Sequence, residues 1–511
     1  MDKKSFYITT AIAYASGKPH LGNTVDAVIA DAIARYKREN GYEVYFQTGA
    51  DEHGEKIEFK ASNEGISPIE YVTRESLGIK EVWDCLNISY DKFIRTTDIE
   101  HVKCVQKIFK KLYDQGDIYK GKYEGLYCVP CESFFTESQA EDGKCPDCKR
   151  ELKKTSEEAY FLETSKYSKF LLDYIESHPT FIEPISRKNE IVNNFIKPGL
   201  QDLCVSRTSI KWGIPVDFDD KHVIYVWLDA LSNYITFLGY DEHKPSEEFK
   251  KFWPADVQII GKDIIRFHAI YWPIILHALG LELPKKIFGH PWLLFGNDKM
   301  SKSKGNIEYA DSLVNKYGVD AIRYYLLHEI PFASDGNFTE ELLIDRINSD
   351  LVNLYGNLVN RTLKMVEKYF DGIIPSMGTE EKLDKLLIDD ALNLYDVINN
   401  KIDDIRVNEA TDEVFNFFRK CNKYIDDTTP WILAKEENIG RLGTVLYNLL
   451  EFIRIGSLYL RPFLPDTSDK ALSFLTSEHL EFSSVKTFGV LKEGTLLPTN
   501  EMLFVRIEKT M

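Results

Sequence analysis

The sequence predicts an α/β protein whose parallel sheet is split by an insertion and followed by a helical bundle. Three observations support this prediction. Two strand-like runs flank an amphipathic helix near the N-terminus, strand-like runs resume after a cysteine-containing segment, and the last third of the chain has a 3.6-residue apolar period. Because the chain has 511 residues, of which 44% are apolar, it can fill the cores of two to four domains.

The first half of the sheet begins with the runs "FYITTAIAYA" and "EVYFQTGAD", which are typical of buried strands. Between them we expect a helix from about Val25 to Tyr36 that stops at Asn40-Gly41, a favoured C-terminal cap. Two lysines and an apolar stretch at the N-terminus also occur in secretion signals, but the β-branched and aromatic residues favour a strand.

The sheet is expected to resume with "VQIIG", a helix from about Ile264 to Leu279 and the run "IFGHPWLLF". Between the two halves, residues 118–222 differ in composition and hold four cysteines, which indicates an inserted module. From about residue 348, segments such as "NSDLVNLYGNLVNRTLKMVEKYF" and "RLGTVLYNLLEFIRIGSLYL" predict the helical bundle.

Charge and hydropathy restrict the class of protein. The 63 basic and 80 acidic residues give a net charge of −17, which argues against coating nucleic acid through bulk electrostatics but leaves local basic surfaces open. No apolar run approaches the roughly 18 residues that span a bilayer. The chain is therefore expected to be cytoplasmic and to have no membrane partner.

Four of the eight cysteines have the spacing of metal ligands. Cys128 and Cys131 form one C-x2-C pair, and Cys145 and Cys148 form a second. Two such knuckles can present four thiolates in a tetrahedron, which suits one structural zinc per chain rather than disulfides or unligated thiols. The other cysteines are expected to be reduced, buried apolar fillers: Cys85, Cys104, Cys204 and Cys421.

The segment "GKPHLGN", residues 17–23, lies where the first strand turns into its helix. A helix N-terminus at the carboxyl end of a parallel strand attracts phosphate, and His20 would add a donor while Gly22 would allow close approach. Taken alone, this segment is better explained as a turn with a buried histidine.

The segment "LLFGNDKMSKSKGN", residues 293–306, is a strand-like run that breaks at Gly296 into a polar loop. Lys299 and Lys302 could reach a phosphate and stabilise the charge that develops during its transfer. Glycines at both ends would let the loop close, although a solvated charged loop is the ordinary alternative.

Together, "HLGN" and "KMSKS" resemble the two signature motifs of class I aminoacyl-tRNA synthetases. Over nearly its whole length the sequence is similar to the methionyl-tRNA synthetase family, through the segments "TTAIAYASGKPHLGN", "TGADEHGEKI", "CVPC", "CPDC", "VWLDALSNYI", "IIGKDIIRFHAIYWP", "KMSKSKGN" and "TTPWILAK". The resemblance implies an enzyme that activates L-methionine with Mg-ATP to methionyl-adenylate and transfers it to tRNA(Met).

The resemblance also implies the domain arrangement. A Rossmann-like catalytic domain would be split by the zinc-binding insertion, and an α-helical anticodon-binding domain would follow. The implied segments are 1–117 and 223–290 for the catalytic halves, 118–222 for the insertion, 291–347 for the lysine loop and stem-contact region, and 348–511 for the anticodon-binding domain. The dimerising extension of some members is absent, so a monomer is expected.

The family's catalytic and ATP-binding residues match particular positions of this chain. The implied catalytic residues are His20, Lys299 and Lys302. Further implied ATP contacts are Gly22, Asn23, Gly261, Asp263 and Ser301. Asn23 departs from the family, which usually has a second histidine there; asparagine can still donate a hydrogen bond but cannot be charged.

A methionine pocket is implied by the same resemblance. Its residues are Ala11, Ile12, Tyr14, Trp227, Ala230, Leu231, Tyr234, Ile264, His268 and Trp272, and Asp51 would take the substrate's ammonium group. The pocket residues within 227–234 recur at helical spacing, and so do those within 264–272, so each group would line one face of a helix. Spacing alone would make them ordinary core stripes.

The bundle contains the implied anticodon site. Pro430 can open a helix and leave the indole of Trp431 near its exposed start, where it could stack on a base; a core tryptophan is the alternative. Asn353, Asn357 and Arg361 recur every four residues and could contact base edges from one face.

Three alternatives remain open from the sequence. A small-molecule nucleotidyltransferase would not need the bundle or the zinc insertion. Another class I synthetase, such as the cysteine enzyme, would need a metal or polar group in place of the Trp227 and Trp272 pocket. A non-catalytic RNA-binding relative would be expected to lack the signature residues, which are present here apart from Asn23.

Overall fold

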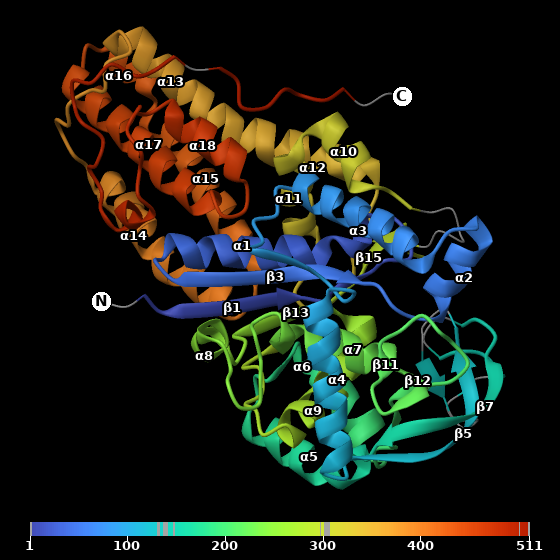
Figure 1. Cartoon of the computed structure of the whole chain (residues 1–511). Helices are drawn as coiled ribbons and strands as arrows, with labels where there is room; N and C mark the ends of the chain where they lie inside the picture. The colour runs from blue at the N-terminus through green and yellow to red at the C-terminus, as the bar shows by residue number, and fades with distance from the viewer. Residues whose placement is uncertain are drawn as a thin grey trace. The chain divides into compact units, whose positions relative to one another are not determined.

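The computed structural model places most of the chain. It describes residues 3–129, 133–135, 140, 142–146, 149–296, 298–300, 307–499 and 501–508. These residues form two compact units, one of residues 1–30 with 43–291 and one of residues 31–42 with 292–511 (Figure 1). Among the described residues, no helix is long and apolar enough to cross a membrane.

The first unit is organised around a parallel sheet with the strand order β2-β3-β1-β13-β14-β8, and β4 also pairs with β3. The strands are β1 (Ser5–Thr10), β2 (Ala13–Tyr14), β3 (Glu43–Asp51), β4 (Lys92–Arg95), β8 (Ile182–Glu183), β13 (Val257–Gly261) and β14 (Ile287–His290). The central strands β1, β3 and β13 are buried over most of their length, because a parallel sheet is covered on both faces.

Helices cover the two faces of this sheet. Figure 1 shows α3 (Pro68–Cys85) on one side of β1 and β3, and α4 (Ile99–Asp114) with α7 (Val226–Thr236) on the other. Side chains from the strands hold α7 in place: Tyr7 Oη donates to the carbonyl of Tyr234 at 2.9 Å, and Gln47 Nε2 donates to Asn233 Oδ1 at 2.8 Å. The parallel pairing of β1, β3, β13 and β14 confirms the predicted sheet.

The helix predicted from Val25 is also confirmed. It runs as α1 (Val25–Glu39), and Gly41 follows with a φ of 80°, the left-handed conformation that glycine adopts at helix ends. Further helices of the first unit are α2 (Glu55–Glu64), α5 (Ser168–Ser177), α6 (Ile185–Ile191), α8 (Glu247–Phe252) and α9 (Trp272–Ala278).

The segment predicted as an insertion begins with an antiparallel sheet. Its strands are β5 (Ile118–Cys128), β6 (Ser133–Phe135), β7 (Lys153–Leu162) and β9 (Leu203–Cys204), and a second small sheet follows with β10 (Ser206–Arg207), β11 (Pro215–Val216) and β12 (Asp219–Ile224). Part of the same range joins the main sheet, because β8 pairs with β14, and Leu171, Ile175 and Phe181 belong to the same apolar core. A two-residue strand leaves no period in the sequence that could reveal this.

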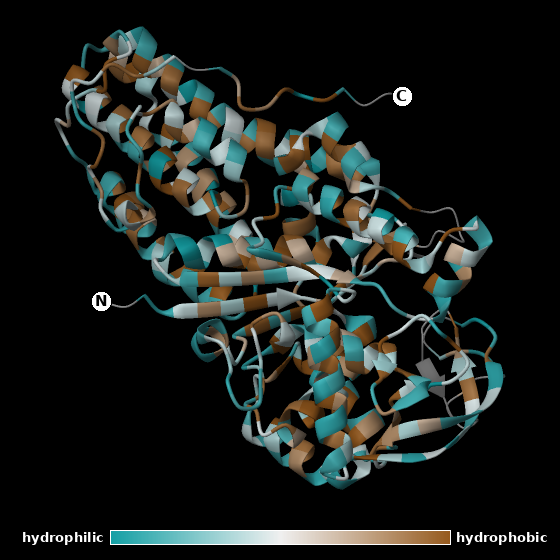
Figure 2. Cartoon of the chain, in the orientation of Figure 1, coloured by the Kyte–Doolittle hydropathy of each residue, from teal (hydrophilic) through white to brown (hydrophobic). Residues whose placement is uncertain are grey.

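The second unit is mainly helical. A small sheet of β15 (Leu293–Phe295), β16 (Asp298–Lys299) and β17 (Gly336–Phe338) precedes the bundle. The helices are α10 (Ala310–Tyr317), α11 (Val319–Glu329), α12 (Glu340–Arg346), α13 (Asn357–Phe370), α14 (Lys382–Asp403), α15 (Val407–Thr428), α16 (Pro430–Lys435), α17 (Ile439–Leu460) and α18 (Pro465–Ser473). Figure 2 shows hydrophobic and hydrophilic bands alternating around these helices, as the predicted bundle requires.

Two predicted α-helices contain π-helical turns. The segment near Ile264 to Leu279 consists of a 3₁₀ turn (Lys262–Ile264), a π turn (Phe267–Tyr271) and α9, and a π-helix (Ile347–Gly356) precedes α13. A π turn uses more residues per turn than an α-helix and is common at functional sites. A strict 3.6-residue face therefore does not hold across these two segments.

Candidate active site

The carboxyl ends of the parallel strands bring several predicted residues to one edge of the sheet. Ala11 follows β1, and its amide donates to the carbonyl of Ile259 in β13 at 3.0 Å. Tyr14 in β2 is the register partner of Asp51, the last residue of β3. Gly261 ends β13 opposite His290. Ligands bind at such an edge in open α/β sheets.

His20 precedes a short 3₁₀ turn (Leu21–Asn23) that leads into α1. The turn is closed by Asn23, whose amide donates to the His20 carbonyl at 2.8 Å and whose Oδ1 accepts the His20 amide at 3.2 Å. Asn23 therefore shapes the turn that presents His20. The half-buried His20 lies at the start of the helix-forming segment, where N–H groups favour an anion.

A pair of carboxylates lies at the start of α1 and at the end of β13. Burial, with a smaller contribution from the nearby charge of Asp263, raises the pKa of Asp26 to about 7. A Cβ at Gly261 would lie 2.7 Å from Asp263 Oδ1, so a larger residue there would displace this carboxylate. Sequence reasoning found Gly261 and Asp263 but missed Asp26, whose position in the helix pattern gave no signal.

The predicted methionine pocket contains a buried hydrogen-bonded pair. Tyr234 Oη and His268 Nε2 are 2.8 Å apart, and His268 Nδ1 is 3.1 Å from the carbonyl of Ile264. Because a carbonyl only accepts, Nδ1 carries the proton and Nε2 accepts from Tyr234. Burial lowers the pKa of His268 to about 4, so this wall of the pocket is neutral at physiological pH.

Aromatic rings complete this region. Trp272 is fully buried, and its ring centroid lies 5.8 Å from that of Tyr234. The half-buried Trp227 stacks on Phe267 at 3.6 Å with an interplanar angle of 4°. Sequence reasoning missed Phe267, which the π turn places against Trp227. Of the other predicted members, Ala230 and Leu231 are buried, and four are half-buried: Ala11, Ile12, Tyr14 and Ile264.

A buried polar network supports the end of β3. Both carboxylate oxygens of Asp229, on α7, lie 2.7 Å from an imidazole nitrogen, one of His53 and one of His101. Burial works against the charge, but the two imidazoles hold the pKa of Asp229 below its usual value. The network ties α7 and α4 to the residues directly after Asp51. Sequence reasoning missed all three, because each lies far from the others in the chain.

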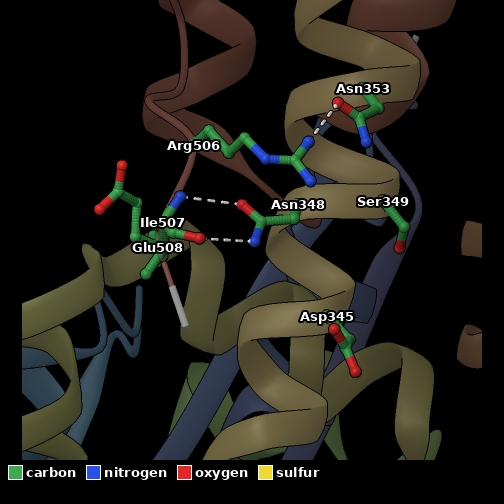
Figure 3. A pocket seen from close by; sticks show the side chains of 7 residues that line it. All are labelled: Asp345, Asn348, Ser349, Asn353, Arg506, Ile507 and Glu508. Atoms are coloured by element: carbon green, nitrogen blue, oxygen red, sulfur yellow. Dashed lines mark hydrogen bonds between the residues drawn. The ribbon is translucent and has the colours of Figure 1, made fainter. Parts of the chain in front are cut away.

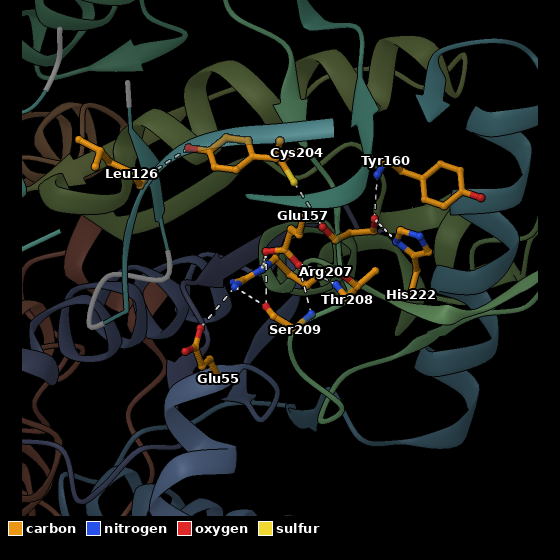
Figure 4. Close-up of polar contacts among 11 residues, drawn as sticks. Glu55, Leu126, Glu157, Tyr160, Cys204, Arg207, Thr208, Ser209 and His222 are labelled. Atoms are coloured by element: carbon orange, nitrogen blue, oxygen red, sulfur yellow. Dashed lines mark hydrogen bonds and ion pairs between the residues drawn. The ribbon is translucent and has the colours of Figure 1, made fainter. Parts of the chain in front are cut away.

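A second network links the antiparallel sheet to the same loop (Figure 4). Arg207, on β10, is 3% exposed; its Nε donates to Glu157 Oε1 at 2.8 Å, and its Nη2 lies 3.4 Å from a carboxylate oxygen of Glu55. Its guanidinium lies 4.2 Å from the centroid of the Tyr127 ring. Since Glu55 opens α2 just after β3, the inserted sheet helps to fix the loop that follows Asp51.

The lysine loop is described only at its start. The strand-like run ends as predicted at Gly296, whose φ is 64°, and the backbone of Lys299 pairs with Leu294. Met300 is 2% exposed. The side chain of Lys299 and the whole of Ser301 and Lys302 lie outside the described residues.

Half of the predicted metal site is described. Cys128, at the end of β5, and Cys145, in the second knuckle, are both fully buried in one cluster with Leu126. Cys131 and Cys148 lie outside the described residues. Two cysteines from different knuckles thus meet in one core, as a shared metal requires. Of the other four cysteines, Cys204 and Cys421 are buried, whereas Cys85 and Cys104 are only partly so.

The predicted anticodon residues lie on the surface of the bundle. Trp431 is 44% exposed in the first turn of α16, directly after the buried Pro430. Asn353, Asn357 and Arg361 are all exposed, and Arg361 Nη2 lies 3.5 Å from Asp426 Oδ1, near the end of α15. The exposed start of the helix predicted for Trp431 is therefore confirmed.

A C-terminal segment contacts one of these residues. Figure 3 shows it along the π-helix, where Asn348 exchanges two 2.9 Å hydrogen bonds with the backbone of Ile507 and Arg506 donates to Asn353 Oδ1 at 3.3 Å. The pocket between them has a volume of about 530 Å³, and its lining is polar: Asp345, Asn348, Ser349, Asn353, Arg506, Ile507 and Glu508. Asn353, one of the predicted anticodon contacts, is thus hydrogen-bonded to the guanidinium of Arg506.

The sheet, the histidine turn and the helical bundle define the class of protein, the class I aminoacyl-tRNA synthetases. The family model "tRNA synthetases class I (M)" matches residues 6–157 and 151–363. A second model, the anticodon binding domain of methionyl tRNA ligase, matches residues 374–511. The chain therefore belongs to the methionyl-tRNA synthetase family.

Individual relatives agree with the family models. The methionine–tRNA ligases of Clostridium acetobutylicum and Clostridium perfringens are 56% and 58% identical to this chain, each over 99% of the chain and 79% of the relative. The structure of Mycobacterium tuberculosis methionyl-tRNA synthetase in complex with methionyl-adenylate matches with a TM-score of 0.94 and 39% identity, covering 98% of this chain and all of that one.

Proposed function

We propose that the carboxyl edge of the parallel sheet is where this methionine–tRNA ligase activates methionine. The observation that carries the proposal is the neutral, aromatic cluster of Tyr234, His268 and Trp272, on helices that pack against this sheet. An uncharged thioether fits such a wall, because it offers sulfur–aromatic contacts and buries no charge. Asp51, at the end of β3, takes the substrate's ammonium group as a charge-assisted hydrogen bond.

The reaction needs no protein nucleophile. The methionine carboxylate attacks the α-phosphorus of ATP and pyrophosphate leaves; a ribose hydroxyl of the terminal adenosine of tRNA(Met) then attacks the activated carbonyl and AMP leaves. The chain contributes alignment and charge stabilisation, with His20, Lys299 and Lys302 at the phosphates. Gly22, Asn23 and Ser301 hold the nucleotide close to them, and Gly261 with Asp263 meets its ribose. Magnesium accompanies ATP and balances part of its charge.

The substrate assignment is tested by ATP–pyrophosphate exchange with each of the twenty amino acids. Methionine alone should support rapid exchange, because polar and charged side chains would lose their hydration against the neutral pocket wall. A Tyr234→Phe variant removes the hydroxyl that holds His268 while it keeps the ring, so the KM for methionine should rise more than the KM for ATP. Faster exchange with cysteine or another amino acid than with methionine would overturn the assignment.

We also propose one structural zinc, held by Cys128, Cys131, Cys145 and Cys148. The burial of Cys128 and Cys145 in one cluster supports it. Four thiolates around the ion leave no open coordination position, so zinc would order the insertion that helps to position the acceptor end of tRNA.

Elemental analysis of protein purified without chelator should find one zinc per chain. Cys145→Ser should lose most of that zinc, since a hydroxyl is a much poorer zinc ligand than a thiolate, while ATP binding is retained. Cys421→Ser is the matched control, because Cys421 is equally buried but lies in α15. Equal zinc content in all three proteins, or none in the wild type, would contradict the assignment.

The bundle recognises the methionine anticodon, CAU, in this proposal. Trp431 supplies an exposed aromatic face, and Asn353, Asn357 and Arg361 supply exposed polar groups. RNA loops are recognised when unstacked bases stack on aromatic side chains and form hydrogen bonds along their edges.

A further inference from the structure

The ends of three long bundle helices meet in one buried polar cluster. Asp384 lies in the first turn of α14, Tyr424 near the end of α15, and Arg441 in the first turn of α17. Arg441 donates to both oxygens of Asp384, at 2.5 and 2.9 Å, and Tyr424 Oη donates to Asp384 Oδ1 at 2.6 Å. Asp384 is fully buried and Arg441 is 3% exposed.

The two charged members of the cluster have several hydrogen-bond partners. Arg441 also donates to the carbonyl of Thr379 at 3.2 Å, and Asn448 Nδ2 donates to Tyr424 Oη at 3.2 Å. Burial works against ionisation of Asp384, yet its hydrogen bonds with Arg441 and Tyr424 hold its pKa below the usual value. Apolar residues could fill such a core without the cost of desolvating two charges. A buried pair of this kind is useful where the exact arrangement of the helices matters.

This arrangement matters for α16, the short helix that carries Trp431. On one side, Thr428 Oγ1 donates to the carbonyl of Tyr424 at 2.6 Å. On the other, the Asn438 amide donates to the carbonyl of Leu433 in α16 at 2.9 Å, and Asn438 Oδ1 accepts from the Arg441 amide at 3.3 Å. Both flanks of α16 are therefore bonded directly to members of the cluster.

The helix α16 cannot hold this position by itself. It has six residues, and helices of that length are unstable without tertiary support. Thr429 before it and Glu437 after it have φ angles of 44° and 54°, in the left-handed region that non-glycine residues rarely adopt. Such conformations persist only where the surrounding structure imposes them.

We propose that Asp384 and Arg441 are positioning residues for tRNA recognition, which fix α16 so that Trp431 presents its indole to a base of the RNA loop. The proposal rests on the function proposed above for Trp431. Neither residue contacts the RNA; each acts through the helix ends that flank α16.

The test compares Asp384→Asn with a matched variant at Arg454 in α17, the helix that also carries Arg441. Asp384→Asn keeps the shape of the side chain and removes its charge. The control variant is Arg454→Met, which breaks the ion pair between Arg454 and Glu451. This pair is also fully buried, but Arg454 donates to the carbonyls of Ser484 and Thr487. Both variants are assayed below their melting temperatures for methionine-dependent ATP–pyrophosphate exchange and for charging of tRNA(Met).

Asp384→Asn should raise the KM for tRNA at least 10-fold, while exchange stays within 2-fold of the wild type. Arg454→Met, if it lowers the Tm as much as Asp384→Asn does, should leave the KM for tRNA within 2-fold of the wild type. Asp384→Glu, which restores the charge, should recover most of the affinity. A KM that follows Tm in both variants, or a normal KM in Asp384→Asn, would overturn the proposal.

If Asp384→Asn folds incompletely, a second measurement is used. The Kd of its folded fraction for an isolated anticodon stem-loop RNA is then determined at low temperature. A wild-type Kd would overturn the proposal, and a Kd raised at least 10-fold would support it. Trp431→Ala, assayed in parallel, distinguishes a failure of the function proposed for Trp431 from a failure of the positioning role of Asp384. If it charges tRNA normally, the proposed function of Trp431 fails; if only Asp384→Asn charges normally, the positioning role fails.

Discussion

Replacing Trp431 by alanine is expected to lower kcat/KM for tRNA charging about 5- to 150-fold, while tRNA-independent ATP–pyrophosphate exchange keeps its wild-type rate. One base stacked on an aromatic ring contributes roughly 1–3 kcal/mol, which corresponds to that range. The indole is 44% exposed, so its removal leaves no internal cavity of the kind that destabilises a core. The two activities are measured on the same enzyme preparation.

Two control variants sharpen this experiment. Trp431→Phe keeps an aromatic face and should retain part of the charging activity. Ile432→Ala removes a neighbouring side chain that is 43% exposed, and it should have a smaller effect because an aliphatic chain cannot stack on a base. Equal loss of charging and exchange in Trp431→Ala would mark the residue as structural, and retention of both would remove it from the site.

Replacing Lys302 by alanine is expected to slow methionyl-adenylate formation on the order of 100-fold, while methionine and tRNA binding change little. A cation that stabilises charge developing on the phosphates acts mainly in the transition state, and groups of this kind contribute about 10²–10³ in rate. The assignment rests on the "KMSKS" segment, since Lys302 lies outside the described residues. Single-turnover measurement of adenylate formation separates this rate from ATP binding.

Lys304→Ala is the matched control for this variant. Lys304 carries the same charge and lies two residues further along, directly after the five residues "KMSKS". Its loss should change the rate only a few-fold if position, rather than total charge, matters. A Lys302→Ala variant with an unchanged rate and only a higher KM for ATP would mean that the lysine binds ATP equally in the ground state.

Local sequence patterns predicted the elements that have a period of their own. The strands β1 and β3, the helix α1 with its stop at Gly41, and the bundle helices α13 and α17 follow from apolar spacing and cap residues. The family resemblance added roles for single residues, such as Asp51 and Trp431, that spacing alone would have assigned to ordinary core or turn positions. Those roles remain predictions, although the exposure of Trp431 and the burial of Tyr234 agree with them.

Other features depend on contacts that no local pattern records. Strand β8 is two residues long, and the π turn that stacks Phe267 on Trp227 interrupts the helical period instead of following it.

By itself, the sequence determined the family, the parallel sheet and the bundle, because periodicity, caps and signature motifs are encoded among neighbouring residues. Only the tertiary structure decided which buried charges meet. Asp229 joins His53 across 176 positions, and Asp384 joins Arg441 across 57. A buried carboxylate is stable only with partners that satisfy it, and those partners come from whichever helices and strands the fold brings together.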